Sequence, residues 1–402
     1  MNATCLGCGC ACDDITVVTR SSTIVEAEHA CALGRTWFGN GVVPTAIRSR
    51  GRAVPLDRAV ADAADLLGAA RHALVFLAGD TSCETQRVAV AIADRLRAVV
   101  HSPTTEIGAG ILAAQRRGRA TATLAEIRLR AAVVVFWGVD PSARYPRFAS
   151  RYLASVDGGP ARRVIAVDIG TARGPQEADE RLAIAAGEEV SALGAMRGAI
   201  LGRPSRGATH ERAAGLARHL AEAPYSAIVH DAEPVEPAFD ADRMDALIGL
   251  TQALNGPSRC ALTALRGGGN RSGVDAVLTW QTGFPMAVDF SRGYPSYEPR
   301  DGVSTLVARR AIDAALVVGS AETVSPTVAS ALAQVPTVAI GPRASTAGFA
   351  PVIAVDTGVA GIHEPGTAFR MDDVPLPLAA PLSGPTTALS VVQGLADRLA
   401  AR

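Results

Sequence analysis

Four cysteines near the start of the chain have the spacing of metal ligands. Cys5, Cys8 and Cys12 lie on one short irregular segment, and Cys31 follows after a predicted hairpin. An iron–sulfur cube is held by several thiolates on one loop and by a more distant thiolate at its far corner. Zinc accepts the same four sulfurs in a tetrahedral site, and His29 could replace one of them. The spacing predicts a metal centre and favours iron–sulfur over zinc.

A metal-free interpretation of the same cysteines stays open. The motif would then consist of reduced buried thiols, or of a disulfide, although disulfides are rare in the reducing cytosol. A small β module buries too little apolar surface to order its own loops, so a bound metal would help it to fold. We expect Cys10 to be a bystander rather than a ligand.

The chain contains no lysine, so all 39 of its basic residues are arginines. This absence excludes Schiff-base chemistry, a lysine general base and the lysine of a phosphate-binding P-loop. Codon usage in a GC-rich genome is a sufficient cause of the bias, and the chemical exclusion holds whatever its cause.

Length and charge exclude other classes of protein. The 402 residues, 48% of them hydrophobic, suffice for two α/β domains and a small appendage. The 39 basic residues balance 39 acidic ones, so nucleic acid is a poor candidate partner. The N-terminus lacks the features of a signal peptide, and no apolar run approaches the roughly 20 residues of a membrane span. We therefore expect a cytoplasmic protein with no membrane partner.

Hydrophobic patterns predict a small β module followed by α/β winding. Residues 13–18 and 23–27 alternate as a hairpin that presents the cysteine loop at its base. Amphipathic segments at 56–70 and 84–99 predict helices. Short runs rich in β-branched residues predict strands buried on both faces, as parallel strands are, at 72–77, 131–138, 163–168, 225–229 and 314–319.

We interpret the chain as an α/β protein with doubly wound, mostly parallel sheets in two domains, and with a small N-terminal β domain that carries the cysteine loop. The β domain is predicted to span residues 1–48. A discontinuous first α/β domain would comprise 49–138 and 311–402, with a second α/β domain inserted at 139–310. Loops after the buried strands are expected to line a ligand crevice.

Two weaker signals suggest other chemistry. The run Gly267–Gly269 could cradle a phosphate, but it lacks the strand and helix context of that motif, so a tight turn is favoured. Cys83, at a predicted helix start where a thiolate could be stabilised, or Cys260 could be the nucleophile of a stand-alone enzyme, although most such cysteines are structural.

Motifs along the whole chain resemble one family. In order they are the cysteine loop and the segments 120–127, 135–141, 145–147, 265–267, 279–285, 288–291 and 366–371. Together they resemble the B subunit of formylmethanofuran dehydrogenase, a member of the molybdopterin oxidoreductase superfamily. In the redox-active family this resemblance implies reduction of carbon dioxide at a tungsten or molybdenum bis-pterin site beside one 4Fe–4S cluster.

The chain departs from this family at the metal ligand. The family carries Cys-His-Gly a fixed distance before a Thr-Leu-Gly/Ala-Glu strand, which corresponds here to residues 123–126. Counting back without a gap places Glu106, Ile107 and Gly108 at the triplet. A hard oxygen donor replaces a soft thiolate, and an alkyl group replaces an imidazole that could move a proton.

Other positions of the former site agree. The family's Asp-Pro-Arg-Lys-Thr loop, which helps to hold pterin phosphates, corresponds to residues 168–172 and lacks a cation. Family histidines correspond to Arg144, Tyr145 and Phe148, whereas an active-site arginine is retained as Arg266. We expect side chains to close the crevice.

Glu106 decides between two functions. In the first, Glu106 is turned to solvent or paired with Arg266 or Arg144. This arrangement is expected for the B subunit of the bacterial formyltransferase/hydrolase complex, which derives from this dehydrogenase. That complex moves formyl from tetrahydromethanopterin to methanofuran or methylofuran and releases formate, and its B subunit is a non-catalytic scaffold without a metal pterin. As a metal ligand, Glu106 would instead mark an active tungsten or molybdenum dehydrogenase subunit.

The scaffold interpretation implies three partners in the same complex. They are an amidohydrolase-type subunit, a β-helical subunit, and a formyltransferase subunit. Trp280, Phe290, Tyr294 and Tyr297 lie in one aromatic stretch suited to interface anchors, with core packing as an equal explanation for Trp280 and Phe290.

Overall fold

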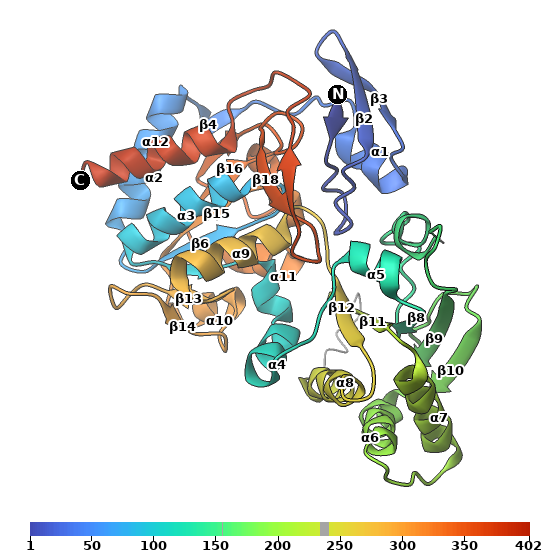
Figure 1. Ribbon diagram of the computed structural model, residues 1–402. Helices are drawn as coiled ribbons and strands as arrows, with labels where there is room; N and C mark the ends of the chain where they lie inside the picture. Colours follow the sequence, from blue (N-terminus) through green and yellow to red (C-terminus); the bar gives the residue numbers. More distant parts are fainter. Residues whose placement is uncertain (155, 234–240) are drawn as a thin grey trace. The chain divides into compact units, whose positions relative to one another are not determined.

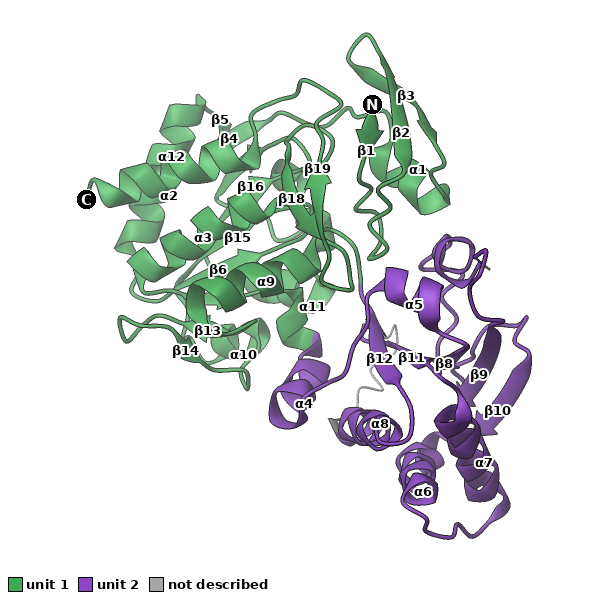
Figure 2. Cartoon of the chain, viewed as in Figure 1, with its two compact units in different colours: residues 1–106, 267–402 green, residues 107–266 purple. Residues whose placement is uncertain are grey.

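The computed structural model describes residues 1–154, 156–233 and 241–402 and divides the chain into two compact units. Unit 1 comprises residues 1–106 and 267–402, and unit 2 comprises residues 107–266 (Figure 2). Unit 1 is discontinuous in sequence, and it includes residues 1–48, which were expected to form a separate β domain. The inserted unit, however, begins and ends earlier than the predicted range of 139–310.

Strand pairing explains this difference. The predicted boundaries place β8 (Val133–Trp137) in the first domain, but it pairs with two strands of unit 2. They also place β13 (Val288–Asp289) in the inserted domain, but it pairs with β7 (Val99–His101) of unit 1. Hydropathy along the chain marks a strand as buried without indicating which of two sheets it joins.

Unit 1 is built on a nine-stranded sheet with the order β14-β13-β7-β6-β15-β16-β17-β4-β5. Strands β7, β6, β15, β16 and β17 run parallel, and the edge strands are antiparallel. The remaining bounds are β4 (Ile47–Ser49), β5 (Arg52–Ala53), β6 (Ala73–Leu77), β14 (Ser296–Tyr297), β15 (Ala314–Val318), β16 (Thr337–Gly341) and β17 (Ile353–Asp356).

Helices cover both faces of this sheet (Figure 1). One core cluster contains residues of α2 (Leu56–Ala69), α3 (Cys83–Leu96), α9 (Arg271–Thr282) and α12 (Ala388–Ala400). The opposite cluster contains residues of α10 (Val303–Ala308) and α11 (Pro326–Leu332). Since the strand order reverses direction between β6 and β15, the unit is doubly wound, as predicted.

Two small sheets complete unit 1. The N-terminal sheet consists of β1 (Asn2–Ala3), β2 (Ile15–Arg20) and β3 (Thr23–Glu28), followed by α1 (Ala32–Phe38). Its β2–β3 pairing is the predicted hairpin, and the cysteine loop joins β1 to β2. The other sheet pairs β18 (Gly366–Phe369) with β19 (Pro375–Leu378).

Unit 2 contains a five-stranded parallel sheet with the order β10-β9-β8-β11-β12. The strands besides β8 are β9 (Arg163–Ile169), β10 (Glu180–Ile184), β11 (Ser226–Asp231) and β12 (Cys260–Leu265). The helices are α4 (Ala109–Arg117), α5 (Leu124–Arg130), α6 (Glu189–Ile200), α7 (Ala208–Glu222) and α8 (Ala241–Leu254). A short π-helical turn, η2, spans Ala149–Leu153.

Residues 123–126 form the start of helix α5 rather than the expected strand. The Glu126 N–H donates to the Thr123 hydroxyl at 3.1 Å, which is an N-cap that the Thr-x-x-Glu spacing itself indicates. In the described part of the chain, no helix is both long and apolar enough to span a membrane.

Candidate functional site

The cysteine loop is closed by its own backbone. Cys5, Cys8 and Cys12 lie between β1 and β2, and Cys31 is the residue before α1. The Cys5 N–H donates to the Cys12 carbonyl at 2.9 Å, and the Ala11 N–H donates to the Cys8 carbonyl at 3.1 Å. These bonds bring the two ends of the motif together.

The structure makes the four predicted ligands neighbours. Cys8, Cys12 and Cys31 all act electrostatically on the Cys5 thiol. A Cβ atom at Gly34 would lie 3.3 Å from the Cys5 Sγ and 3.9 Å from the Cys31 Sγ, so both sulfurs face this glycine of α1. The distant fourth cysteine therefore reaches the loop, as the spacing predicts.

The pKa values of two of these thiols are shifted in opposite directions. Burial is the main reason that the pKa of Cys5 is raised, although the Gly7 N–H donates to its Sγ at 3.4 Å and opposes the shift. A hydrogen bond from the Cys10 side chain is the main reason that the pKa of Cys8 is lowered to about 7. Cys8 is thus partly a thiolate at neutral pH, and Cys10 supports it.

The donor set fits a soft metal. All seven cysteines lie in the described residues as free thiols, so the disulfide interpretation is wrong for this structure. His29 is exposed and is not among the groups that act on Cys5. The four sulfurs suit iron–sulfur or zinc. Within the described residues, no three His, Cys, Asp or Glu side chains already converge as ligands, so binding would require the thiols to move closer.

The glycine run 267–269 packs against the cysteine loop instead of forming a phosphate cradle. A Cβ atom at Gly268 would lie 2.1 Å from the Leu6 carbonyl oxygen and 2.8 Å from the Cys8 nitrogen. The Gly269 N–H donates to the Leu6 carbonyl at 2.8 Å. The run therefore allows close backbone approach to the cysteine loop, which a search for phosphate motifs does not detect.

Glu106 is turned to solvent in unit 1. It lies on the 3-10 turn η1 (Pro103–Ile107), and its side chain accepts a hydrogen bond from the Ser325 hydroxyl at 3.1 Å. Ser325 is the N-cap of α11, so its position is fixed by that helix. Ile107, the first residue of unit 2, is half-buried.

The two candidate arginines pair with carboxylates of their own unit. The Arg266 Nε lies 3.7 Å from the Glu233 Oε1, and both side chains are nearly buried. Arg144 forms an ion pair with Asp231. Burial raises the pKa of Asp231 even though Arg144 opposes the shift. The positive charges of Arg266 and Arg144 are thus offset inside unit 2.

Tyr145 and Phe148, which were expected to stand in place of family histidines, pack among other aromatic residues. Tyr145 and Phe148 are buried, and the Phe148 ring makes edge contacts with Phe136 at 5.9 Å and Tyr152 at 5.6 Å between centroids. These residues therefore belong to the core of unit 2.

The loop after β9 obtains a cation from a neighbouring strand. The Asp168 carboxylate accepts the Gly174 N–H at 2.9 Å and pairs with the Arg181 Nη1 at 2.7 Å. Arg181 lies on β10, which is adjacent to β9 in the sheet. Comparison with the family motif along the loop did not identify Arg181, because this residue lies on the neighbouring strand and not in the loop itself.

Neither Cys83 nor Cys260 is suited to nucleophilic catalysis. Both are buried, and burial is the main reason that the pKa of each thiol is raised to about 11. The Asn270 side chain donates to the Cys83 Sγ at 3.6 Å without reversing this effect. The expectation that the start of α3 stabilises a Cys83 thiolate is wrong, because burial outweighs the helix end.

A cavity in unit 1 was not expected from the motifs. It has a volume of about 420 Å³ and lies where β6, β15 and β16 end, with Trp37, Asp80, Ser320 and Arg343 among its lining residues. The Trp37 Nε1 donates to the Asp80 Oδ1 at 3.2 Å, and burial raises the pKa of Asp80. Ligands of doubly wound folds bind at such strand ends, but of the loops expected to line a crevice only the one after β6 contributes to this cavity, through Asp80.

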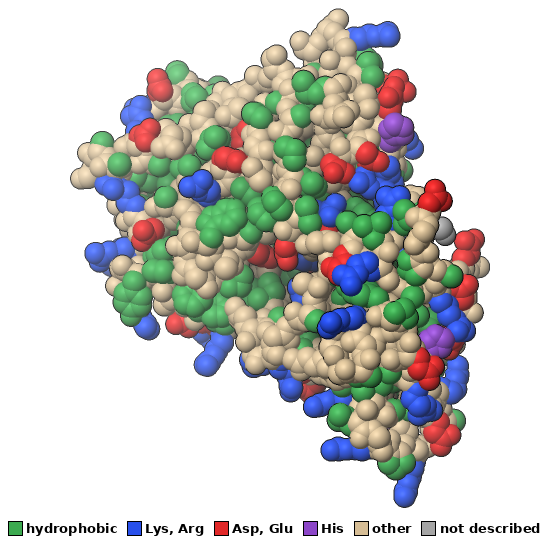
Figure 3. Space-filling model, in the orientation of Figure 1, with side chains coloured by type: hydrophobic (Ala, Val, Ile, Leu, Met, Phe, Trp, Pro, Cys, Tyr) green, Lys and Arg blue, Asp and Glu red, His purple; other side chains and the backbone are tan. Residues whose placement is uncertain are grey.

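The aromatic stretch divides between surface and core. Trp280 is 53% exposed and Tyr294 is 56% exposed, whereas Phe290 is buried. Trp280 lies 5.9 Å from Phe369 between ring centroids, and Figure 3 shows apolar side chains gathered over α9 and β18, which carry these residues. Core packing therefore explains Phe290 but not Trp280.

These observations define the chain as a two-unit, doubly wound α/β protein with a cysteine-rich N-terminal loop. No protein-family model matches it. It is 29% identical over 422 residues to the B subunit of the tungsten-containing formylmethanofuran dehydrogenase 2 of Methanococcus maripaludis, covering 97% of this chain and 95% of that protein. The protein of the same name from Methanocaldococcus jannaschii is 29% identical over 414 residues, covering 96% and 94%.

A solved structure is also similar to this chain. The chain is similar to a chain of the formyltransferase/hydrolase complex of Methylorubrum extorquens, solved with methylofuran, with a TM-score of 0.75 and 26% identity. The match covers 89% of this chain and 99% of that one. The predicted resemblance is confirmed: over nearly its whole length this chain is similar to the B subunit of formylmethanofuran dehydrogenase.

Proposed function

We propose that this chain is the non-catalytic structural B subunit of a cytoplasmic formyltransferase/hydrolase complex of one-carbon metabolism. The observation that carries the proposal is the state of the former metal ligand. Glu106 is exposed and bonded to Ser325 within unit 1, while Ile107 replaces the histidine that would move a proton. Seven free thiols are compatible with a reducing compartment.

The charge arrangement in unit 2 supports the same proposal. A pterin phosphate requires cations that are free to bind it. Arg266 and Arg144 instead pair with Glu233 and Asp231, and Arg181 pairs with Asp168. We therefore propose that no tungsten or molybdenum pterin is bound.

The cysteine loop would have a structural role. Cys5, Cys8, Cys12 and Cys31 would hold a 4Fe–4S cluster, or zinc as the alternative, and the metal would cross-link a module with a small core. The Gly7 N–H bonded to the Cys5 sulfur is typical of a cluster ligand, since such bonds stabilise a metal-bound thiolate. An empty site of four reduced thiols is the competing state.

The proposed partners are an amidohydrolase-type subunit, a β-helical subunit, and a formyltransferase subunit. The exposed rings of Trp280 and Tyr294 support this part of the proposal, because large exposed aromatic side chains are typical anchors of subunit interfaces. The face shown in Figure 3 carries acidic and basic side chains interspersed. Such a surface suits protein partners better than a polyanion.

Co-expression with the three partner subunits tests the function. We expect a stable complex whose formyl transfer and hydrolysis are unchanged by Glu106→Gln, and no stoichiometric tungsten or molybdenum in mass spectrometry of the purified complex. Stoichiometric tungsten or molybdenum that disappears in Glu106→Gln would establish the alternative, an active dehydrogenase subunit with a carboxylate ligand. A chain that stays monomeric beside all three partners would contradict the scaffold role.

A further inference from the structure

The cavity of unit 1 combines a recessed carboxylate with an apolar rim. Its lining includes the half-buried side chain of Asp80, and also Leu33 and Val42, which are 36% and 61% exposed. Exposed large apolar side chains that gather around a hollow are typical of a contact with another macromolecule. The charges inside the cavity then decide which kind of group fits it.

Asp80 lacks a cation of its own. Its Oδ1 accepts the Trp37 Nε1–H at 3.2 Å, and its carboxylate forms no ion pair with any residue that the structure describes. Burial raises the pKa of Asp80, and the negative charge of Glu322 adds to the shift. Arg271 opposes the shift but is the weakest of these influences. A cation placed in the cavity would therefore stabilise the charged form of Asp80.

The other charges of the cavity cancel. The Glu322 Oε1 lies 2.6 Å from the Arg343 Nη1, so these two lining side chains form an ion pair. Burial lowers the pKa of His363, which keeps its ring neutral at pH 7. Among the described lining residues there is no further aspartate, glutamate or arginine. The cavity thus has one uncompensated negative charge, that of Asp80.

The backbone holds Asp80 in place. Its φ angle is +60°, in the left-handed region that aspartate and asparagine adopt more readily than most residues. Its N–H donates to the Gly269 carbonyl at 2.9 Å. The bond from Trp37 fixes the other end of the residue. The carboxylate is therefore positioned in advance of any binding.

Trp37 gives the cavity a wall that suits a long basic side chain. The indole ring is the strongest aromatic partner of a cation. Arginine and lysine also bury their alkyl stems along apolar surface while the charged end reaches a polar group. Here Leu33, Val42 and Trp37 match the stem, and Asp80 matches the charged end.

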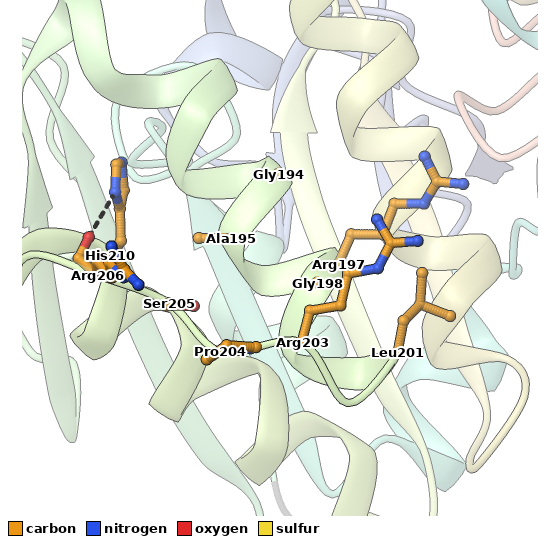
Figure 4. A pocket seen from close by; sticks show the side chains of 10 residues that line it. All are labelled: Gly194, Ala195, Arg197, Gly198, Leu201, Arg203, Pro204, Ser205, Arg206 and His210. Carbon is orange, nitrogen blue, oxygen red and sulfur yellow. Dashed lines mark hydrogen bonds between the residues drawn. The ribbon is translucent and has the colours of Figure 1, made fainter.

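The hollow between α6 and α7 in unit 2 lacks such a built arrangement. It is lined by Arg197, Arg203 and Arg206, but the side chains of Arg197 and Arg203 point away from Arg206 and His210 (Figure 4). Its charged groups do not converge on one point. The cavity of unit 1 differs, because its single uncompensated charge is held by Trp37.

We infer that the cavity of unit 1 is a docking site for a partner subunit, which inserts one arginine or lysine side chain toward Asp80. This inference rests on the proposed function, because it requires a different subunit of the same complex. A second copy of this chain suits the site less well. It would bring a surface other than the cavity, so the contact would repeat from copy to copy as a ring or a filament.

The variant Asp80→Asn tests the charge of the site in the complex with the three partner subunits. Asparagine tolerates the same backbone angle and still accepts the Trp37 N–H, so only the charge is lost. We expect the affinity of the chain for the partner subunits to fall at least tenfold, while the isolated variant melts no lower than the wild type. The control Asp57→Asn removes an exposed carboxylate of α2 outside the cavity and should change the affinity less than twofold.

A cross-link identifies the inserted side chain. A photoreactive phenylalanine analogue in place of Val42 should attach, in the assembled complex, to a partner segment that contains an arginine or a lysine. Replacing that basic residue by glutamine should weaken binding of the wild-type chain at least tenfold but binding of Asp80→Asn less than twofold, because the two groups act as a pair.

The outcomes separate this inference from the proposed function. If the wild-type chain assembles and Asp80→Asn assembles with equal affinity, the docking site is wrong and the scaffold role stands. A cross-link between two copies of this chain, or to a partner segment without a basic residue, also overturns the docking site. If the wild-type chain does not assemble with the partner subunits, both the docking site and the proposed function fail.

Discussion

The Ser82 hydroxyl donates to the Glu364 carboxylate at 2.7 Å, deep inside unit 1. The same carboxylate accepts the Thr85 hydroxyl at 2.8 Å and the Leu389 N–H at 3.2 Å. Ser82 is the N-cap of α3, and Leu389 lies in the first turn of α12. One internal anion thus joins the N-terminal ends of two helices, where negative charge is favourable.

Glu364→Gln should therefore destabilise unit 1. The amide keeps the shape but loses charge-assisted bonds in a buried site, so we expect a loss of about 1–3 kcal/mol in the free energy of unfolding by urea. Glu322→Gln is the control, because Glu322 is exposed and its pair with Arg343 is a surface contact worth about 1 kcal/mol or less. Equal effects of the two substitutions would contradict the role of Glu364.

Gly268→Ala should disrupt the cysteine loop. The new Cβ would lie 2.1 Å from the Leu6 carbonyl, so the backbone of one segment must move. We expect a lower melting temperature and weaker metal retention, measured by calorimetry and iron and zinc analysis. The control is Gly394→Ala in α12, where the new Cβ would meet no heavy atom within 4 Å. This substitution should stabilise the helix by about 0.5–1 kcal/mol.

Metal content distinguishes ligands from bystanders among the cysteines. After anaerobic purification we expect iron, or else zinc, in stoichiometric amount, and we expect Cys8→Ser to remove most of it. Cys10→Ser should retain the metal, since Cys10 contributes a hydrogen bond to Cys8 rather than a ligand. If the wild-type chain contains neither metal and Cys8→Ser leaves stability and assembly unchanged, the motif is a relic.

Two buried histidines should make the protein acid-sensitive. Burial is the main reason that the pKa of His101 is lowered to about 4 and that of His230 to about 3, from 6.5. Unfolding therefore takes up protons below pH 6.5. Their contribution to stability is fully present above that pH and is lost as the pH falls, by about 1.4 kcal/mol per unit for each histidine.

Urea unfolding between pH 8 and pH 5 measures this slope. His101→Asn should flatten the dependence in unit 1, and His230→Asn should do so in unit 2. A pH dependence that stays the same in both variants would assign the acid sensitivity to other groups.

Assembly should depend on the exposed rings and not on the buried one. Trp280→Ala and Tyr294→Ala should weaken co-purification with partner subunits while leaving the melting temperature of the isolated chain nearly unchanged. Phe290→Ala should instead cost about 3–5 kcal/mol of folding stability, because the ring is buried. Unchanged assembly in the first two variants would place the interface elsewhere.

The features predicted correctly from the sequence are those that local patterns of residues determine. The helices α2 and α3, the strands β6 and β15 and the N-terminal hairpin follow from the periodicity of apolar residues. The grouping of Cys5, Cys8, Cys12 and Cys31 follows from their spacing. These features depend on residues close together in the chain.

Features that depend on distant segments were not predicted. The sheet that β8 joins, the pairing of Arg181 with Asp168, and the approach of Gly268 to Leu6 all arise when remote parts of the chain meet. Glu364 carries no motif at all, since its partners are helix ends far away in the sequence. The periodicity of apolar residues along the sequence contains no information about such contacts.

The insertion of unit 2 between β7 and β15 has a consequence for synthesis on the ribosome. Strand β6 pairs with β15, and the cysteine loop contacts Gly268, but both partners are translated only after all of unit 2. The sheet of unit 2 can form as soon as residue 265 has emerged. At that point strand β6 of unit 1 still lacks its neighbour β15. The nascent chain therefore exposes the apolar strand β6 and the cysteine loop throughout much of translation, and any metal that the four cysteines bind would find its complete site only after Gly268 has emerged.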